Sequence, residues 1–294
     1  MRLGVSISST HPADGPRLMI ERTRVAHEAG FSSLSIGDHH NMPVPYAQNT
    51  PMLGRLLADW VDRPAGCLFL VPLWHPVLMA EQIGTLAAIH HSASPDVPFI
   101  VQTGIGHGQS QFDAFGASMS TRGRVLAATI EAVTAMLAGE RVDRDDLGLV
   151  GGRVGLRSDG PIEWWIGAGV DTAIERAARM GDAWYGAPGL GPDDGRAKVD
   201  LYRSLGGTRA IVRKDALVLA DGDEARRRAS ELVEQGYRGM TLDNLLVGAP
   251  DDVAASLDAL AEAGFDDVIV RSMSVPQELA LETLSLLGPL GSAI

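Results

Sequence analysis

The sequence has little cysteine, no long apolar run and fewer basic than acidic residues, and each shortage excludes a class of protein. Its single cysteine, Cys67, cannot form an intramolecular disulfide, which fits a reducing compartment. No apolar run approaches the roughly 18 residues that a membrane-spanning helix needs. The first residues, MRLGVSISS, lack the apolar centre of a signal peptide. We therefore expect a cytoplasmic protein with no membrane partner.

The charge excludes a second class of partner. The chain carries 25 Lys and Arg against 37 Asp and Glu, a net charge of −12, and such a surface repels phosphate backbones. We expect no nucleic-acid partner. The 294 residues and 45% hydrophobic content suit a single α/β barrel domain over 1–294, because such barrels take about 250 residues.

Short apolar segments alternate with amphipathic ones along the whole chain. This alternation predicts a (β/α)₈ TIM barrel, an α/β fold, with a doubly wound open sheet as the competing arrangement. The predicted strands are residues 3–8, 33–36, 67–71, 97–102, 162–166, 183–185, 210–219 and 267–270. The clearest predicted helices are residues 20–29, 76–91, 122–137, 173–180, 223–235, 250–263 and 277–287. The Gly- and Pro-rich residues 186–195 are either a lid or a plain connection.

Histidines cluster where the predicted strands end, which is the catalytic face of such a barrel. The side chains placed there are His11, Asp38, His39, His40, His75 and His107. Imidazoles suit proton transfer near neutral pH. A metal-dependent hydrolase would want an HxH pair after the first strand and a carboxylate after the last, but the chain has Ser8-Ser9-Thr10 and Arg271-Ser272 there. We expect no metal. The helical His27, His90 and His91 are interpreted as surface or packing residues.

Two glycine-rich segments also follow predicted strands. QTGIGHG, residues 102–108, lets backbone at Thr103 and Gly104 approach a bulky ligand, or simply forms a tight turn. It is no Rossmann fingerprint, because the third glycine would fall at Gln109. Gly167-Ala168-Gly169-Val170 precedes a helix and suits a phosphate cradle, although Asp171 or Thr172 could cap that helix instead.

Several segments, in order and over nearly the whole chain, are similar to one family. The segments are AHEAGFSSLSIGDHHN (26–41), LVPLWHPVLMAEQIGTL (70–86), VQTGIGHGQSQFDAFG (101–116), PIEWWIGAGVDTAIERAARMGDAWY (161–185) and LLVGAPDDVAASLDALAEAGFDDVIVR (245–271). The chain resembles the bacterial luciferase-like superfamily of flavin- and F420-dependent oxidoreductases. The resemblance implies the luciferase-like form of the (β/α)₈ barrel.

The resemblance also implies roles for residues. The cofactor ring would rest on a bulge of the third strand at Gly66-Cys67, often with a cis peptide bond, and cross Thr103 and Gly104. Its phosphate would lie at residues 167–170. His39 would handle a proton, held by Asp38 or by a nearby backbone group. His107 stands where some deazaflavin enzymes carry a glutamate.

The activity implied is that of a monooxygenase using reduced FMN and O₂ on a small organic substrate. A separate flavin reductase would supply the FMN, and the chain would form a homodimer. Hydride transfer with F420 on the same fold is the alternative. A non-catalytic flavin-binding protein and a metal-dependent barrel hydrolase remain as further alternatives.

Overall fold

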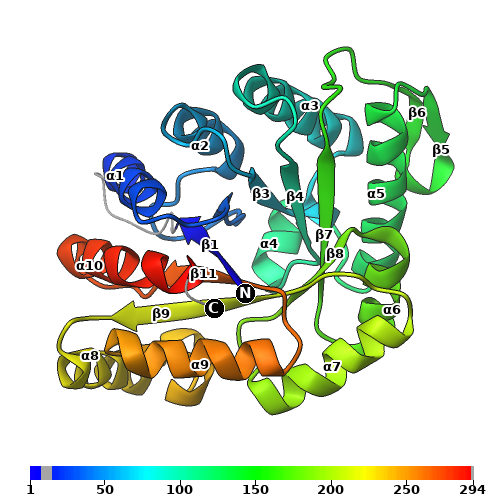
Figure 1. The fold of residues 1–294 in the computed structure, drawn as a ribbon. Helices are drawn as coiled ribbons and strands as arrows, with labels where there is room; N and C mark the ends of the chain where they lie inside the picture. Colours follow the sequence, from blue (N-terminus) through cyan, green and yellow to red (C-terminus); the bar gives the residue numbers. More distant parts are fainter. Residues whose placement is uncertain (8–14, 293–294) are drawn as a thin grey trace.

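The computed structural model describes residues 1–7 and 15–292 (Figure 1). His11 and the Ser8-Ser9-Thr10 segment, which were placed after the first strand, lie outside the described residues. Within the described part of the chain, no helix is both long and apolar enough to cross a bilayer.

Eight parallel strands close into a barrel, so the predicted (β/α)₈ TIM barrel is confirmed and the open sheet is wrong. The strands are β1 (Arg2–Ile7), β2 (Leu34–Ile36), β3 (Ala65–Leu70), β4 (Phe99–Gly104), β7 (Ile162–Ala168), β8 (Ala183–Gly186), β9 (Ala210–Val218) and β11 (Asp267–Ser272). They pair in this order, β11 pairs with β1, and the β8–β9 pairing closes the ring. Their buried Val, Ile, Leu and Phe side chains form the core, as expected for strands covered on both faces.

Helices surround the strands, as Figure 1 shows. They are α1 (Gly15–Glu28), α2 (Asn49–Leu56), α3 (Pro76–Ala93), α4 (Gln109–Ala114), α5 (Arg122–Leu137), α6 (Asp171–Met180), α7 (Pro192–Ser204), α8 (Gly222–Glu234), α9 (Pro250–Glu262) and α10 (Gln277–Leu287). Each barrel connection therefore returns the chain to the same end of the barrel, and the carboxyl ends of all eight strands meet at one mouth.

Some elements lie beyond the predicted pattern. A hairpin of β5 (Val142–Arg144) and β6 (Leu149–Gly152) follows α5, and β10 (Leu246–Gly248) adds to the edge of β9. The Gly- and Pro-rich segment is shorter than predicted, because α7 already begins at Pro192. Proline at the first helical position and two aspartates in the first turn both favour a helix start there.

Candidate active site

Two cavities open at the mouth of the barrel. One, of about 310 Å³, is the arginine cavity; its lining includes Ser6, Met42, Tyr46, Tyr237, Arg271 and Ser274. The other, of about 330 Å³, is the glycine cavity; its lining includes Leu70, Thr103, Gly104, Gly106, His107, Gly167, Ala168, Gly169 and Pro188. Both are also lined by Asp38, His39, Leu68, Arg213 and Arg238. The two cavities therefore adjoin, with His39 at their junction.

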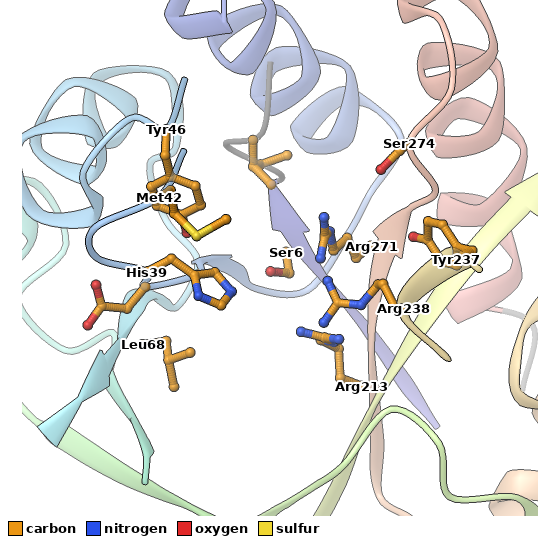
Figure 2. A pocket seen from close by; sticks show the side chains of 13 residues that line it. Ser6, His39, Met42, Tyr46, Leu68, Arg213, Tyr237, Arg238, Arg271 and Ser274 are labelled. Carbon is orange, nitrogen blue, oxygen red and sulfur yellow. The ribbon is translucent and has the colours of Figure 1, made fainter. Parts of the chain in front are cut away.

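His39 reaches this junction from the loop after β2, and Figure 2 shows its ring turned into the arginine cavity. The ring lies edge-on to Tyr46 and His107, with centroids 5.5 and 5.8 Å away. Its Nδ1 is buried, with no hydrogen-bond partner among the described residues. Burial, followed by the charges of His107 and Arg238, lowers the pKa of His39 to about 4. The imidazole is therefore uncharged at neutral pH and can donate or accept a hydrogen bond.

Asp38 is buried in the same loop, but its carboxylate contacts residues other than His39. Its Oδ2 accepts hydrogen bonds from the backbone N–H of Leu70 and from Nε1 of Trp74, both at 2.8 Å. Its Oδ1 lies 3.2 Å from Nε2 of His40. The expectation that Asp38 holds His39 is therefore wrong: the carboxylate fixes the end of β3 and the neighbouring histidine.

His40 belongs to the wall behind the site. Its ring packs against Phe115, with centroids 4.9 Å apart, and its backbone N–H donates to Oε1 of Gln111 at 3.1 Å. Nε2 of Gln111 in turn donates to the carbonyl of His107 at 3.0 Å. Gln111 thus ties the loop after β2 to the loop after β4. This brings His39 and His107 together, as the sequence predicted for residues at strand ends.

The glycine cavity gathers the predicted cofactor segments of β4 and β7. The backbone N–H of Gly167 donates to Oγ1 of Thr103 at 3.3 Å, and a Cβ on Gly167 would lie 2.2 Å from the Thr103 carbonyl oxygen. Only glycine fits this approach of the two strands. A Cβ on Gly169, in contrast, would meet open space.

The start of α6 lies beside this glycine segment. Val170 is the N-cap residue, and no side chain of the described chain caps the helix by a hydrogen bond. The alternative that Asp171 or Thr172 caps α6 is therefore wrong, and the helix N-terminus keeps donors available to a ligand. The side chain of Val170 is exposed and does not belong to the lining of the cavity.

Gly66 and Cys67, like Val170, are predicted site residues that line neither of the two cavities. Both lie within β3, where a Cβ on Gly66 would overlap the carbonyl oxygen of Ile100 on β4 and Cys67 is fully buried. The described chain contains no cis peptide bond, so the bond expected between them is trans. The residues of β3 that line the cavities are Leu68 and Leu70, because the register of β3 places them closer to the mouth.

The remaining histidines have other surroundings. His75 is exposed at the start of α3 and belongs to the lining of neither cavity. His91 lies against Ser158 and the carbonyl of Val97, and His27 against the carbonyl of Val61, which confirms packing and surface roles. In residues 1–7 and 15–292, no group of three or more His, Cys, Asp or Glu side chains is arranged to hold a metal ion.

Sequence reasoning missed the arginines at the mouth. Figure 2 shows Arg213 of β9, Arg271 of β11 and Arg238 of the loop after α8 grouped opposite His39. Asp215 lies fully buried beside them, 3.6 Å from Nε of Arg213 and 3.5 Å from Nε of Arg238. Arg271 lies near the carboxyl end of β11, and this position was the available signal. Arg213 is the fourth of the nine residues of β9, so its position in the strand gave no such signal.

Arg176 of α6 was also missed. Its guanidinium lies near Gly123, at the start of α5, and its buried Nε has no hydrogen-bond partner in the part of the chain that the structure describes. Burial lowers the pKa of Arg176, with Arg179 adding to the effect. A cation thus lies on the helix whose N-terminus borders the glycine cavity.

Comparison with known proteins identifies the family. A family model described as luciferase-like monooxygenase matches residues 1–238. The chain belongs to the luciferase-like monooxygenase family. A curated relative, the F420-dependent glucose-6-phosphate dehydrogenase of Beutenbergia cavernae, is 28% identical over 209 residues, which are 65% of this chain and 58% of the relative. The chain thus matches less than two thirds of the length of that relative.

Two solved structures of monooxygenases share the fold. A monooxygenase from Streptomyces bottropensis has a TM-score of 0.81 at 21% identity, with 98% of each chain covered. The oxygenating constituent of 3,6-diketocamphane monooxygenase from Pseudomonas putida, in complex with FMN, has a TM-score of 0.75 at 16% identity, covering 98% of this chain and 96% of the other. The luciferase-like form of the barrel is therefore confirmed.

Proposed function

We propose that this protein is an oxidoreductase that binds reduced FMN in the glycine cavity and acts, with O₂, on a small organic substrate in the arginine cavity. The observation that carries the proposal is that the two cavities adjoin at His39. A cofactor in one cavity can therefore reach a substrate in the other. Cavities of a few hundred Å³ with a few polar groups at the mouth of a barrel are typical small-molecule sites.

The residues of the glycine cavity fit a flavin-type cofactor. Backbone at residues 167–169 and the uncapped N-terminus of α6 suit its phosphate, and Arg176 adds a cation nearby. Leu68, Leu70 and Gly104 offer an apolar and backbone surface for its ring. When bound, the cofactor supplies the reducing electrons of the reaction.

His39 is the residue that we assign to proton handling. Its ring lines both cavities, its Nδ1 has no partner among the described residues, and it is uncharged at neutral pH. A neutral imidazole can give a proton from one nitrogen and take one at the other. His107, 5.8 Å away between ring centroids, borders the glycine cavity and completes a polar edge to it.

Hydride transfer with F420 is the second candidate, and the curated relative favours it because its printed name is that of an F420-dependent enzyme. Neither the shape of the glycine cavity nor His39 distinguishes the two cofactors. A non-catalytic flavin-binding protein would use the same cavity without turnover.

Titration of the purified apoprotein with FMN and with F420, followed by fluorescence, tests the assignment. We expect FMN to bind, and a single turnover of reduced FMN to consume O₂ in step with substrate. Tight binding of F420 alone would replace the first candidate with the second. Binding of either cofactor without consumption of reductant over a substrate panel would favour the non-catalytic protein. A flavin reductase that supplies reduced FMN and a homodimer are further parts of the proposal, tested by reconstitution and by light scattering.

A further inference from the structure

The described lining of the arginine cavity is rich in arginine, although the chain as a whole carries a net charge of −12. Arg213, Arg238 and Arg271 all line it. The carboxylate of Asp38, which also lines it, already accepts two hydrogen bonds and lies at 3.2 Å from His40. Asp215 is a second carboxylate nearby. Among the described residues, the three guanidinium groups therefore outnumber these two carboxylates, one of which is directed to another network.

The hydrogen bonds of Arg213 are incomplete. Its Nε and Nη2 are buried with no hydrogen-bond partner among the described residues, because Asp215 lies 3.6 Å away, beyond hydrogen-bond distance. Asp215 instead accepts a hydrogen bond from the hydroxyl of Tyr237 at 2.8 Å. Buried charged donors without acceptors are costly and rare in folded proteins. Donors of this kind at a cavity wall indicate an acceptor that binds there.

The three arginines also act on one another. Burial and the charges of Arg271 and Arg213 lower the pKa of Arg238 to about 10. Arg238 belongs to the 3₁₀ segment Tyr237–Gly239 and has a backbone φ of 51°, in the left-handed region that non-glycine residues seldom adopt. The chain thus holds a third cation close to two others in a strained conformation. Such strain persists where the surrounding structure requires the position.

We propose that the arginine cavity is a subsite for an oxyanion, a carboxylate or a phosphate group, carried by the substrate. Guanidinium groups bind both oxyanions through paired N–H donors. Ser6 and Ser274 line the same cavity and add hydroxyl donors to it, whereas the hydroxyl of Tyr237 already donates to Asp215. That the bound molecule is the substrate rests on the function proposed above, whereas anion binding at the three arginines does not.

Binding at this subsite would also orient the rest of the substrate relative to His39. His39 faces the three arginines across the cavity, as Figure 2 shows. A molecule anchored by its anionic end therefore presents its remaining carbons to His39 and to the glycine cavity behind it. The bound negative charge also offsets the influence of Arg238 and Arg271 on His39, both of which lower its pKa.

The test measures anion binding to the apoprotein, without cofactor or turnover. The thermal unfolding midpoint is followed against inorganic phosphate and against acetate at constant ionic strength, with chloride as reference, because a ligand of the native state raises it. The variants are Arg238→Gln and Arg213→Gln, and the second keeps the test open if the first does not fold. The control is Arg144→Gln, which removes one positive charge from the hairpin after α5, where Arg144 pairs with Asp146 and Glu131.

We expect phosphate or acetate to stabilise the wild type and the control equally, with Kd at least about tenfold weaker in the cavity variants, as for the loss of a charged hydrogen bond. Stabilisation by neither anion, or unchanged Kd in both cavity variants, would overturn the subsite. Displacement of the bound anion by FMN or F420 would assign the arginines to the cofactor tail and overturn the substrate assignment. If neither cofactor binds while the anion dependence on Arg238 persists, the subsite stands and the proposed redox function fails.

Discussion

His39 is distinguished from the other histidines by three properties that occur together. It lies between two cavities, it has a buried nitrogen without a partner among the described residues, and its pKa is lowered to about 4. His90 shares the lowered pKa, also about 4 and caused mainly by burial, but lies on α3 away from both cavities. Position therefore decides between a packing role and a chemical one.

Replacing His39 by alanine tests the chemical role. We expect turnover with bound cofactor to fall by about 10²–10⁴, the usual contribution of a general acid–base group. Cofactor affinity should change little, because the backbone of residues 167–169 is untouched. The measurement is single-turnover kinetics, and the exposed His75→Ala is the control, with turnover unchanged. Equal turnover in His39→Ala and wild type would remove His39 from the mechanism.

The lowered pKa of His39 also predicts a pH dependence of stability. The unfolded chain takes up a proton near pH 6.5, while the folded chain resists it down to about pH 4. The unfolded state therefore binds more protons in this window, and the free energy of unfolding falls as the pH decreases from 6.5 to 4. Urea titrations across this range measure the slope.

His39→Gln provides the matched variant for that slope. It has no titrating group at this position, so its slope between pH 6.5 and 4 should be shallower than that of the wild type, with the remainder left to groups such as His90. Identical slopes would show that the folded protein protonates His39 as easily as the unfolded chain does.

At the scale of elements, the loop between β8 and α7 is fastened to its neighbours. The buried Nζ of Lys214, on β9, donates to the carbonyls of Pro188, Leu190 and Asn244. Nδ2 of Asn244 donates to the carbonyl of Gly189 at 3.0 Å. Since Pro188 lines the glycine cavity, these bonds hold one wall of the cavity in place.

Lys214→Met should remove the hydrogen bonds that hold the loop between β8 and α7 in place. We expect the free energy of unfolding to fall by about 1–3 kcal/mol, because three carbonyls lose a charged donor, and FMN or F420 affinity to weaken. Urea denaturation and cofactor titration give the two readouts. Lys198→Met, which removes a more exposed lysine 3.6 Å from Asp171, should stay within about 0.5 kcal/mol of wild type. A loss no larger than that of the control would contradict the fastening role.

Elements with strong periodicity were predictable, and the register of the strand ends was not. The pattern predicted the eight barrel strands, yet residues 67–71 were predicted where β3 spans Ala65–Leu70. The family resemblance assigned Gly66 and Cys67 to the cofactor, whereas Leu68 and Leu70 are the β3 residues that line the cavities. An unbroken apolar run shows no alternation that fixes its ends. The hairpin of β5 and β6 was missed because its strands are only three and four residues long.

The site was predictable where it followed from barrel geometry alone. His39, His107, Thr103 and Gly167 come after or at the ends of strands, and the structure brings them to one cavity. Arg238 was beyond prediction, because it lies in an irregular segment whose approach to Arg213 depends on packing far from it in sequence. The hydrogen-bond partners of Asp38 could not be predicted either, because they depend on the direction of its side chain, which sequence spacing does not determine.

For the whole molecule, an ion network lies at the amino-terminal ends of the strands. Arg209, directly before β9, donates to Asp267 of β11 at 2.6 Å and to Glu163 of β7 at 2.8 Å. Arg2 of β1 reaches the same Asp267, also at 2.6 Å. We expect these ion pairs to stabilise the fold without taking part in the reaction, because the active sites of such barrels lie at the opposite face.

Arg209→Met should destabilise the barrel without changing its chemistry. We expect a loss of about 2–3 kcal/mol, less than the 3–5 kcal/mol typical of fully buried pairs, because Arg209 is partly exposed and Arg2 remains. Urea denaturation measures the loss. The control is Arg227→Met on α8, which removes an exposed ion pair with Glu231 and should leave the free energy of unfolding nearly unchanged. A large drop in turnover of the folded Arg209→Met protein would contradict this separation of faces.

Because Cys67 is buried inside the protein, the rate at which its thiol is labelled reports the rate at which the barrel opens. Burial raises its pKa well above the ordinary value, so almost no thiolate exists to meet a reagent while the strands stay joined. Covalent labelling at this atom then proceeds only as fast as the molecule opens. Cys67 is the single cysteine of the sequence, so thiol labelling reports on one site alone. The chain therefore contains an internal reporter of its kinetic stability.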